Sequence, residues 1–446
     1  MPVHPDRVGG LTAHLLRSSD VAYLREALKN TSFPMLTTLT VSHDDSDSTS
    51  SSGATLSPPP VFDLSHLRLP FLSSISMSHA SMALTPALAS QLRFLEMKSD
   101  TAGASHQLPL EPFLAALGSF SQLQKLSLIR CFAAPRPGGS PPSVVPAARP
   151  SLSASRLLDV AIEDYPSSIG RIMSELAVPS SANVVLRGNA RGATVGLCWS
   201  SFLAMLPSNL QRMHILRACE SIEVTVTHSM CRVYGSMVKG GDHTPPGVTL
   251  ELELDTDLCH TQGHAAYPAA QAARRQLLSS LLRSLEQIFL TTTVSYLKIH
   301  GPVSAIVAND WITSLFPLHN LRHLVVVDEY LVEFPDRLLD CLRATPVLPP
   351  DAPPLCPALD SLELYGDIKF EEEGTTQLEL LVSALQWRMQ NEGITTLRIL
   401  KVGLFSTVAL PVQALEHYRR EFYRLTLKSG CSLEVKVSPL HSRTHA

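Results

Sequence analysis

Charged residues are scarce in this 446-residue chain. Asp, Glu, Lys and Arg together make up 17% of the sequence, whereas about 25% is usual in globular proteins. The formal net charge is −4, so the chain has no excess of basic residues to neutralise a phosphate backbone. This balance argues against nucleic acid, and no nucleic-acid partner is expected.

Long hydrophobic runs are also missing. No stretch approaches 18 uninterrupted apolar residues, so we expect no transmembrane helix and no membrane partner. Residues 1–6 lack the basic flank and apolar run of a secretory signal. The eight cysteines form no Cys-x-x-Cys pair, and most have apolar neighbours, as Cys198 has in Trp199. Reduced, buried cysteines are typical of a cytoplasmic or nuclear protein, which is the predicted location.

Motifs that would support catalysis are absent or poorly placed. The sequence has no Gly-x-Ser-x-Gly elbow and no phosphate-binding loop. Asp257, His260 and His264 form the densest polar cluster, and the two histidines have the spacing of metal ligands. Gly263 disfavours the helix that would align the two rings. We therefore expect a non-enzymatic protein without a cofactor or metal, with a metal-dependent enzyme at this cluster as the alternative.

What the chain does contain is a recurring unit, in which a helical pattern leads into a short segment of the form apolar-x-x-apolar-x-apolar. These segments begin at Leu36, Leu72, Leu92, Leu123, Leu157, Leu210, Val294, Leu321, Leu359 and Ile394. Most successive starts are 20 to 38 residues apart. A single such unit cannot bury both its helix stripe and its strand, but stacked units can. The pattern predicts an irregular, leucine-rich-repeat-like α/β solenoid, with parallel strands on one face and helices on the other.

Several helices and further strands can be placed by their periodicity. Apolar residues at helical spacing predict helices over residues 169–176, 269–290, 376–389 and 411–423. Alternating segments suggest more strands at 184–186, 222–226 and 250–254, and a final strand at 432–437. Together these elements predict one repeat array over residues 1–437, with a tail at 438–446. Pro-, Gly- and Ser-rich insertions are expected near residues 42–60, 133–155, 239–247 and 345–357.

Three segments carry a family resemblance, namely residues 33–39, 317–324 and 356–364. In these segments the chain resembles the leucine-rich-repeat region of F-box proteins, especially the divergent sets found in fungi. The resemblance implies a protein partner and substrate recognition for an SCF-type ubiquitin ligase, with a ligase adaptor as a further partner. The F-box itself is not seen, because residues 11–41 are predicted to form a helix and a repeat strand. A repeat adaptor outside ubiquitination, or a degenerate F-box relative, is the alternative.

The turns after the repeat strands depart from that family. Asparagine or cysteine usually follows the repeat leucines there, but only Cys131 fits that place in this chain. Asp44, Asp100 and Asp367 occupy it elsewhere. Because an aspartate lacks the amide donor of asparagine, we expect these turns to be open and solvated.

The residues between the repeat leucines should point out of the sheet, onto a predicted concave face. The strongest candidates for binding are Phe94, Lys125, Arg212, His214, Tyr296, Lys298, His300, His323, Glu363, Tyr365 and Arg398, with Glu96 and Lys98 on the same face. Both signs of charge occur among them, together with the Tyr and Arg side chains that often anchor protein interfaces. The predicted use of this face is to bind a protein.

Overall fold

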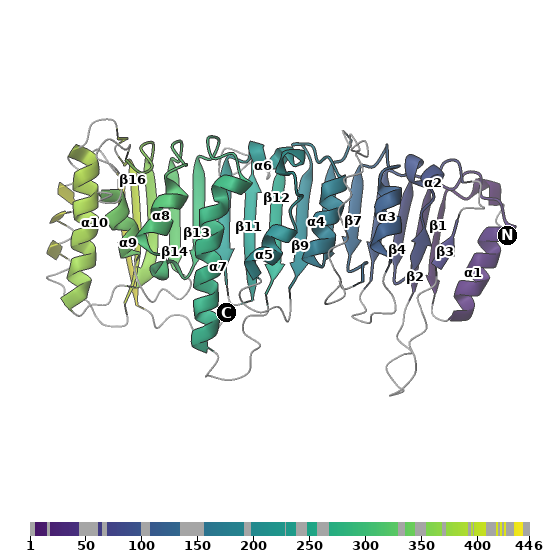
Figure 1. Cartoon of the computed structure of the whole chain (residues 1–446), viewed down its shortest axis with the longest axis horizontal. Coiled ribbons are helices and arrows are strands. Elements are labelled where there is room, and N and C mark those ends of the chain that lie inside the picture. The colour runs from purple at the N-terminus through teal and green to yellow at the C-terminus, as the bar shows by residue number, and fades with distance from the viewer. Residues whose placement is uncertain are drawn as a thin grey trace. The chain divides into compact units, whose positions relative to one another are not determined.

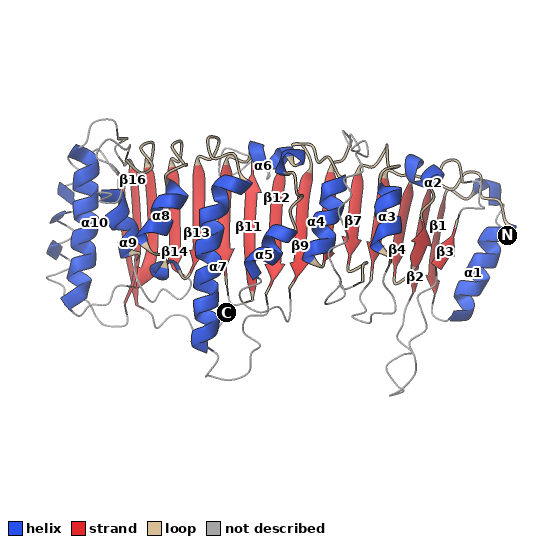
Figure 2. Ribbon diagram, in the orientation of Figure 1, coloured by secondary structure: helices blue, strands red, loops and turns tan. Residues whose placement is uncertain are grey.

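In the computed structural model the chain consists of two compact units. Their helices and strands are labelled in Figure 1. Unit 1 is residues 1–190, 200–215 and 251–254, and unit 2 is residues 191–199, 216–250 and 255–446. The residues described are 5–15, 18–43, 61–64, 69–99, 108–133, 156–190, 198–227, 229–237, 248–256, 267–328, 335–343, 354–367, 372–390, 394–395, 397–406, 416–417, 420–421, 423–424 and 432–439. Each unit is mixed α/β, with helices on one face of mostly parallel strands (Figure 2).

Unit 1 is built on parallel strands. In spatial order these are β1 (Gly10–Leu15), β2 (Thr38–His43), β4 (Ser74–Ser78), β6 (Phe94–Lys98), β7 (Lys125–Ile129), β8 (Asp159–Asp164) and β9 (Asn183–Asn189), with most of β12 (Thr249–Asp255) beside β9. A separate parallel pair is formed by β3 (Val61–Asp63) and β5 (Ser81–Ala83). The helices are α1 (Ser18–Asn30), α2 (Pro86–Gln91), α3 (Leu110–Leu117), α4 (Pro166–Glu175) and most of α5 (Cys198–Ala204), with 3-10 turns η1 (Pro5–Arg7) and η5 (Leu210–Arg212).

Unit 2 begins with an antiparallel pair and continues in parallel. Its strands, in spatial order, are β11 (Met230–Ser236), β10 (Ser221–Val226), β13 (Tyr296–Gly301), β14 (His323–Asp328), β15 (Ser361–Asp367), β16 (Ile399–Ser406) and β17 (Ser432–Pro439). Only β10 and β11 are antiparallel among these pairs. The helices are α7 (Tyr267–Ile288), α8 (Ala308–Leu315), α9 (Asp336–Arg343) and α10 (Glu372–Gln390), with a 3-10 turn η7 (Val303–Ala305). The short α6 (His214–Ala218) contributes residues to both units.

The core of each unit consists of apolar ladders that cross the strands in register. In unit 1 the ladders are Leu39, Ile75, Leu95, Leu126, Val160, Val184 and Val41, Met77, Met97, Leu128, Ile162, Leu186. In unit 2 they are Ile222, Leu297, Leu324, Leu362, Leu400 and Val224, Ile299, Val326, Leu364, Val402. All of these side chains are at most 2% exposed. Each buried side chain of this size contributes about 1.5–3 kcal/mol, so the ladders fix which face of each strand is inside.

Helix packing over the ladders follows from the apolar stripes seen in the sequence. In α4, Pro166 occupies the first turn, where its missing N–H costs no hydrogen bond, and Ile169, Ile172 and Met173 are buried. In α8 the whole side chain of Trp311 is buried. The helices therefore close the apolar side of the strands and leave the opposite side for polar residues.

Most expected strands are confirmed, but two are corrected. The segment at Leu210 is a 3-10 turn followed by α6, because the Asn209 side chain accepts a hydrogen bond from the Gln211 N–H (3.0 Å) and bends the chain. The strand predicted from Ile394 lies three residues further along the chain than expected. Leu400 and Val402 are the ladder residues there.

Four strands were not expected at all. They are β1, which lies within the stretch predicted to be helix, β11, and the short parallel pair of β3 and β5. The antiparallel pairing of β11 with β10 also departs from the expected all-parallel arrangement. The suggested strands at 184–186, 222–226, 250–254 and 432–437 are confirmed.

Other expectations concern the connections and the termini. The predicted insertions lie mostly outside the described residues. Of the helix predicted over 411–423, only residues 416–417, 420–421 and 423 are described, and these are helical. Among the helices of the described ranges, none combines the length and hydropathy that a bilayer span requires. The six cysteines that are described are buried and form no disulfide with one another, as their apolar neighbours predicted.

Candidate functional site

The structure divides the predicted binding residues between the two units. Phe94 and Lys125 are register partners on β6 and β7 of unit 1. In unit 2, six of the predicted residues project from three adjacent parallel strands, β13 to β15: Tyr296, Lys298, His300, His323, Glu363 and Tyr365. Strand pairing therefore brings these six onto one surface. Together with Glu223, Val325 and Lys401, they make up what we call the paired-charge face.

Two predicted residues do not belong to any strand. Arg212 ends η5, and its guanidinium donates a hydrogen bond to the backbone carbonyl of Ser174 at the end of α4. His214 begins α6, and its backbone N–H donates to the Val178 carbonyl (3.2 Å). Their expected place on a repeat strand is therefore wrong, because the chain turns at Asn209 instead of extending.

A row of alternating charge runs across the middle of the paired-charge face. In register, the row reads Glu223, Lys298, Val325, Glu363, Lys401 and Glu434. The Lys298 ammonium lies 3.1 Å from the Glu223 carboxylate, and the Lys401 ammonium lies 2.8 Å from that of Glu363. Val325 separates the two pairs and is 8% exposed. Cross-strand pairs of opposite charge stabilise a sheet modestly, and they hold long side chains in a defined geometry.

Tyr365 lies in the next row, with Val327 and Gly403, and is fixed by two neighbours. Its hydroxyl donates a hydrogen bond to Oε2 of Glu363 (3.0 Å). Gly403 lies opposite on β16, and a Cβ atom there would be 2.3 Å from Cδ1 of the Tyr365 ring. The ring therefore occupies the space that a larger residue at 403 would need, and glycine is required for this close approach.

Tyr296 lies on the other side of the charged row, beside His323. Like Tyr365, it is close to the carboxylate of Glu363. Burial, followed by the charges of Glu223 and Glu363, raises the pKa of Tyr296 to about 12. Burial, followed by the hydrogen bond to Glu363, raises the pKa of Tyr365 to about 12. Both phenols are therefore neutral at physiological pH, and each keeps an O–H group for hydrogen bonding.

Asp360 connects two of the predicted residues. It immediately precedes β15, and only 6% of its surface is exposed. The Arg398 guanidinium donates to its Oδ2 (2.5 Å), and Nε2 of His323 lies 3.9 Å from its Oδ1. Since the Arg398 side chain is itself 74% exposed, this pair presents a cation at the margin of the paired-charge face.

On the solvent-facing side of unit 1, the strands β2 and β4 carry hydroxyl side chains in place of charged ones. Serine and threonine alternate with the ladder residues on β2 and β4, at Thr38, Thr40, Ser42, Ser74, Ser76 and Ser78. Charge appears further along the sheet, where the Arg130 guanidinium pairs with Glu163 (2.8 Å) and that of Arg187 with Glu251 (3.3 Å). Phe94 is 42% exposed beside these polar rows.

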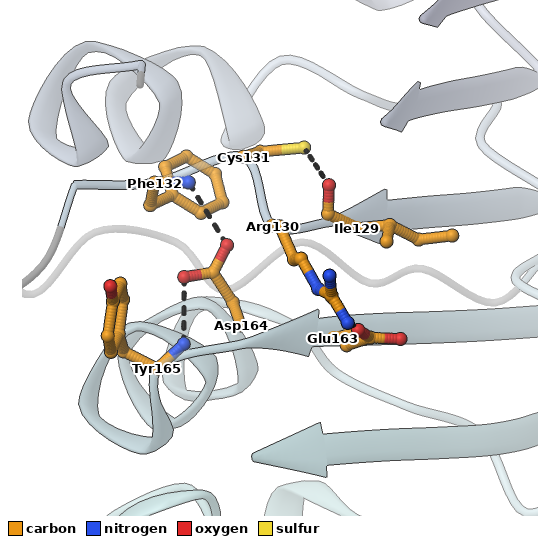
Figure 3. Close-up of polar contacts among 7 residues, drawn as sticks. All are labelled: Ile129, Arg130, Cys131, Phe132, Glu163, Asp164 and Tyr165. Atoms are coloured by element: carbon orange, nitrogen blue, oxygen red, sulfur yellow. Dashed lines mark hydrogen bonds and ion pairs between the residues drawn. The ribbon is translucent and has the colours of Figure 1, made fainter. Parts of the chain in front are cut away.

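The turns that follow β7 and β8 are closed by an aspartate (Figure 3). Asp164 is 3% exposed, and its carboxylate accepts hydrogen bonds from the backbone N–H groups of Phe132 (3.0 Å) and Tyr165 (2.8 Å). Its burial raises its pKa to about 6, against the opposing effect of these bonds. The prediction of open, solvated turns concerned Asp44, Asp100 and Asp367, not Asp164, and it stays a prediction, because the side chain of Asp367 is not described. Asp44 and Asp100 lie outside the described residues.

Three charged residues of the site were missed by sequence reasoning. Glu223 was visible as the polar position of an alternating segment, Ile222-Glu223-Val224. Lys401 was hidden by the three-residue register error, and the correct ladder, Leu400-x-Val402, places it outward. Asp360 precedes its strand, so no alternation pointed to it.

The described residues offer no evident catalytic or metal centre. Asp257, His260 and His264 lie outside the described residues, and no group of three potential metal ligands is found within those ranges. Burial raises the pKa of all six described cysteine thiols, to about 12 for Cys219 and Cys356 and about 11 for Cys341. These thiols are protonated at neutral pH and lack the thiolate that nucleophilic catalysis requires.

No protein-family model, curated protein or solved structure matches this chain. The geometry of the paired-charge face is therefore the main guide to function.

Proposed function

We propose that this protein is a non-enzymatic, protein-binding scaffold with a leucine-rich-repeat-like solenoid fold, and that the paired-charge face binds its partner. The observation that carries the proposal is the register of β13 to β15, which gathers Tyr296, His323, Glu363 and Tyr365 on one solvent-facing surface. The solenoid assignment is supported by the repeated order of parallel strand and covering helix in each unit.

The character of the face supports a protein partner. Its lysines are already neutralised by glutamates within the chain, so it lacks the free basic stripe that a polyanion would need. Tyr365 is held by Glu363 and by the space over Gly403 before binding, which reduces the conformational entropy lost on association. Tyrosine rings combine a large apolar surface with a hydroxyl and are common interface anchors.

We further propose substrate recognition for an SCF-type ubiquitin ligase as the cellular role. The resemblance of residues 33–39, 317–324 and 356–364 to F-box leucine-rich repeats supports it. The alternative is a repeat adaptor outside ubiquitination. Affinity capture of the intact chain from native cell extract, with mass-spectrometric identification, separates the two. A recovered ligase adaptor supports the ligase role, and partners recovered without an adaptor contradict it.

The double variant Tyr296→Ala, Tyr365→Ala tests the face itself. We expect it to weaken partner binding by about 2 kcal/mol or more, roughly a 30-fold loss, because interface tyrosines are frequent hot spots. The matched control is Tyr23→Ala, which removes a tyrosine that is 78% exposed on α1. The captured partner would be titrated against each variant by calorimetry. Equal affinity for the double variant and the wild type would rule out the face as the binding site.

Gly403→Ala tests the placement of the Tyr365 ring without removing it. The new methyl group would displace the ring and break its hydrogen bond to Glu363, while the ladder beneath stays intact. We expect about a 10-fold loss of partner affinity with a melting temperature close to that of the wild type. Unchanged affinity, with a displaced ring shown by crystallography, would argue against prior positioning of Tyr365.

A further inference from the structure

The first strand of unit 1 has an unpaired edge. β1 is the terminal strand of its sheet, and β2 is its one strand neighbour. In a parallel pair the N–H and C=O groups of one residue point to the same side of the strand, and successive residues point to opposite sides. Gly9 directs its carbonyl toward β2, where it accepts from Thr37 and Thr38 (2.8 and 3.3 Å). By alternation, Gly10, Thr12 and His14 direct their backbone groups away from β2. Within the described ranges, nothing hydrogen-bonds to those groups.

This edge also lacks the features that usually prevent strand pairing. Residues 10–15 read Gly-Leu-Thr-Ala-His-Leu and contain no proline, lysine or carboxylate. The terminal strand of unit 2 differs, because β17 contains Glu434, Lys436 and Pro439. Charged residues and proline on an edge strand oppose the addition of another strand. The edge of β1 is therefore open to pairing.

The apolar ladders of unit 1 are incomplete at β1. Leu11 and Ala13 continue the ladders of Leu39 and Val41, which are 0% and 1% exposed. Leu11 and Ala13 are only half-buried. A strand added beside β1 would cover these two side chains and extend both ladders by one step.

We propose that a second copy of this chain fills this edge, by antiparallel pairing of β1 with β1 about a two-fold axis at Thr12. In this register Thr12 faces Thr12, Gly10 faces His14, and Leu11 faces Ala13 of the other copy. All three residues with outward backbone groups then pair with one another, and each pair exchanges two hydrogen bonds. Apolar side chains meet only apolar ones, and solvent-facing side chains meet only solvent-facing ones. A shift by one residue would break both matches.

The sequence of β1 is thus complementary to itself, which is what a closed, isologous dimer requires. The strand is six residues long, so the area buried is small, and the dimer should form in a concentration-dependent manner. The paired-charge face lies in unit 2, and the variants that test the dimer leave it untouched.

Cysteine cross-linking tests the proposed register of β1 with β1 of the second copy. Thr12→Cys places two thiols opposite each other, at a Cα separation near 5.5 Å that a disulfide can span. His14→Cys is the matched control, because it lies on the same side of the same strand but faces Gly10. Under mild oxidation, we expect most of the Thr12→Cys chain to run as a covalent dimer on a non-reducing gel, with little dimer for His14→Cys or the wild type. Equal cross-linking of the two variants, or none for Thr12→Cys, overturns the proposal.

A charge variant tests the same interface without covalent chemistry. Thr12→Lys sets two like charges face to face in the dimer, yet it is only an exposed substitution in a single chain. Thr40→Lys is the control, because it lies in the same row on β2, away from the edge. By sedimentation over a range of concentrations, the wild type and Thr40→Lys should dimerise, whereas Thr12→Lys should remain monomeric with an unchanged circular dichroism melt. A monomeric wild type at every concentration, or a dimeric Thr12→Lys, overturns the proposal.

Discussion

Replacing Gly170 with alanine is expected to destabilise unit 1 by about 3 kcal/mol or more. Gly170 lies in α4, where a Cβ atom would be 2.0 Å from the Ala204 carbonyl oxygen and 3.1 Å from that of Leu206. Both neighbours are backbone atoms, so no side-chain rotation can relieve the clash. The helix must move away from the segment after α5, which would open the core around Ile169 and Met173.

Urea denaturation followed by circular dichroism would measure this loss for Gly170→Ala. Gly118→Ala is the matched control, because that glycine ends α3 in a right-handed conformation and its Cβ would be 3.8 Å from the nearest atom. Alanine there should be neutral or should add a few tenths of a kcal/mol by restricting the unfolded chain. If Gly170→Ala and Gly118→Ala unfold at the same urea concentration, the close packing of α4 on residues 204–206 is wrong.

The buried carboxyl of Asp164 is expected to make the stability of unit 1 depend on pH. Its pKa is about 6 in the folded chain, whereas an unperturbed aspartate has a pKa of 3.8, so folding favours the neutral form. Its contribution to stability is therefore full below about pH 4 and is lost as the pH rises through 6. The difference between the two pKa values corresponds to roughly 3 kcal/mol.

Asp164→Asn isolates this effect, because asparagine stays neutral at every pH. The amide also loses one of the two backbone hydrogen bonds, but that loss does not vary with pH. We therefore expect the unfolding free energy of the variant, minus that of the wild type, to rise by roughly 3 kcal/mol between about pH 4 and about pH 8. Urea titrations at each pH would measure it. Asp159→Asn on the solvent-facing side of β8 is the control, and a pH-independent difference for Asp164→Asn would contradict the prediction.

Much of the architecture could be derived from the sequence, because the side-chain period of a strand decides which face is buried. Leucine spacing placed Leu39, Leu95, Leu126 and Leu324 in the ladders correctly. The same alternation put Tyr296, Lys298, Glu363 and Tyr365 on the opposite side, where the structure has them. These assignments need only local information, since each depends on a strand and its own pattern of burial.

Local information was insufficient where a single polar side chain redirects the backbone. The apolar spacing at Leu210 satisfies the repeat pattern, yet Asn209 turns the chain and removes Arg212 and His214 from the sheet. The strand β1 was missed because its six residues lie just before α1 and were included in one predicted helix, although Leu11, Ala13 and Leu15 alternate with Thr12 and His14. In both places, the competing conformations differ little in local energy, and the contacts with neighbouring segments select one.

The sequence by itself determined that strands and helices alternate, that leucines form the inside, and that polar and aromatic residues face out. Only the tertiary structure decided which outward residues meet. Lys401 reaches Glu363, and Tyr365 packs over Gly403, because the register of β15 and β16 aligns them across 38 residues of sequence. Asp164 is buried because neighbouring turns point their N–H groups at it. Register and burial are properties of packed neighbours, and no pattern within a single strand specifies them.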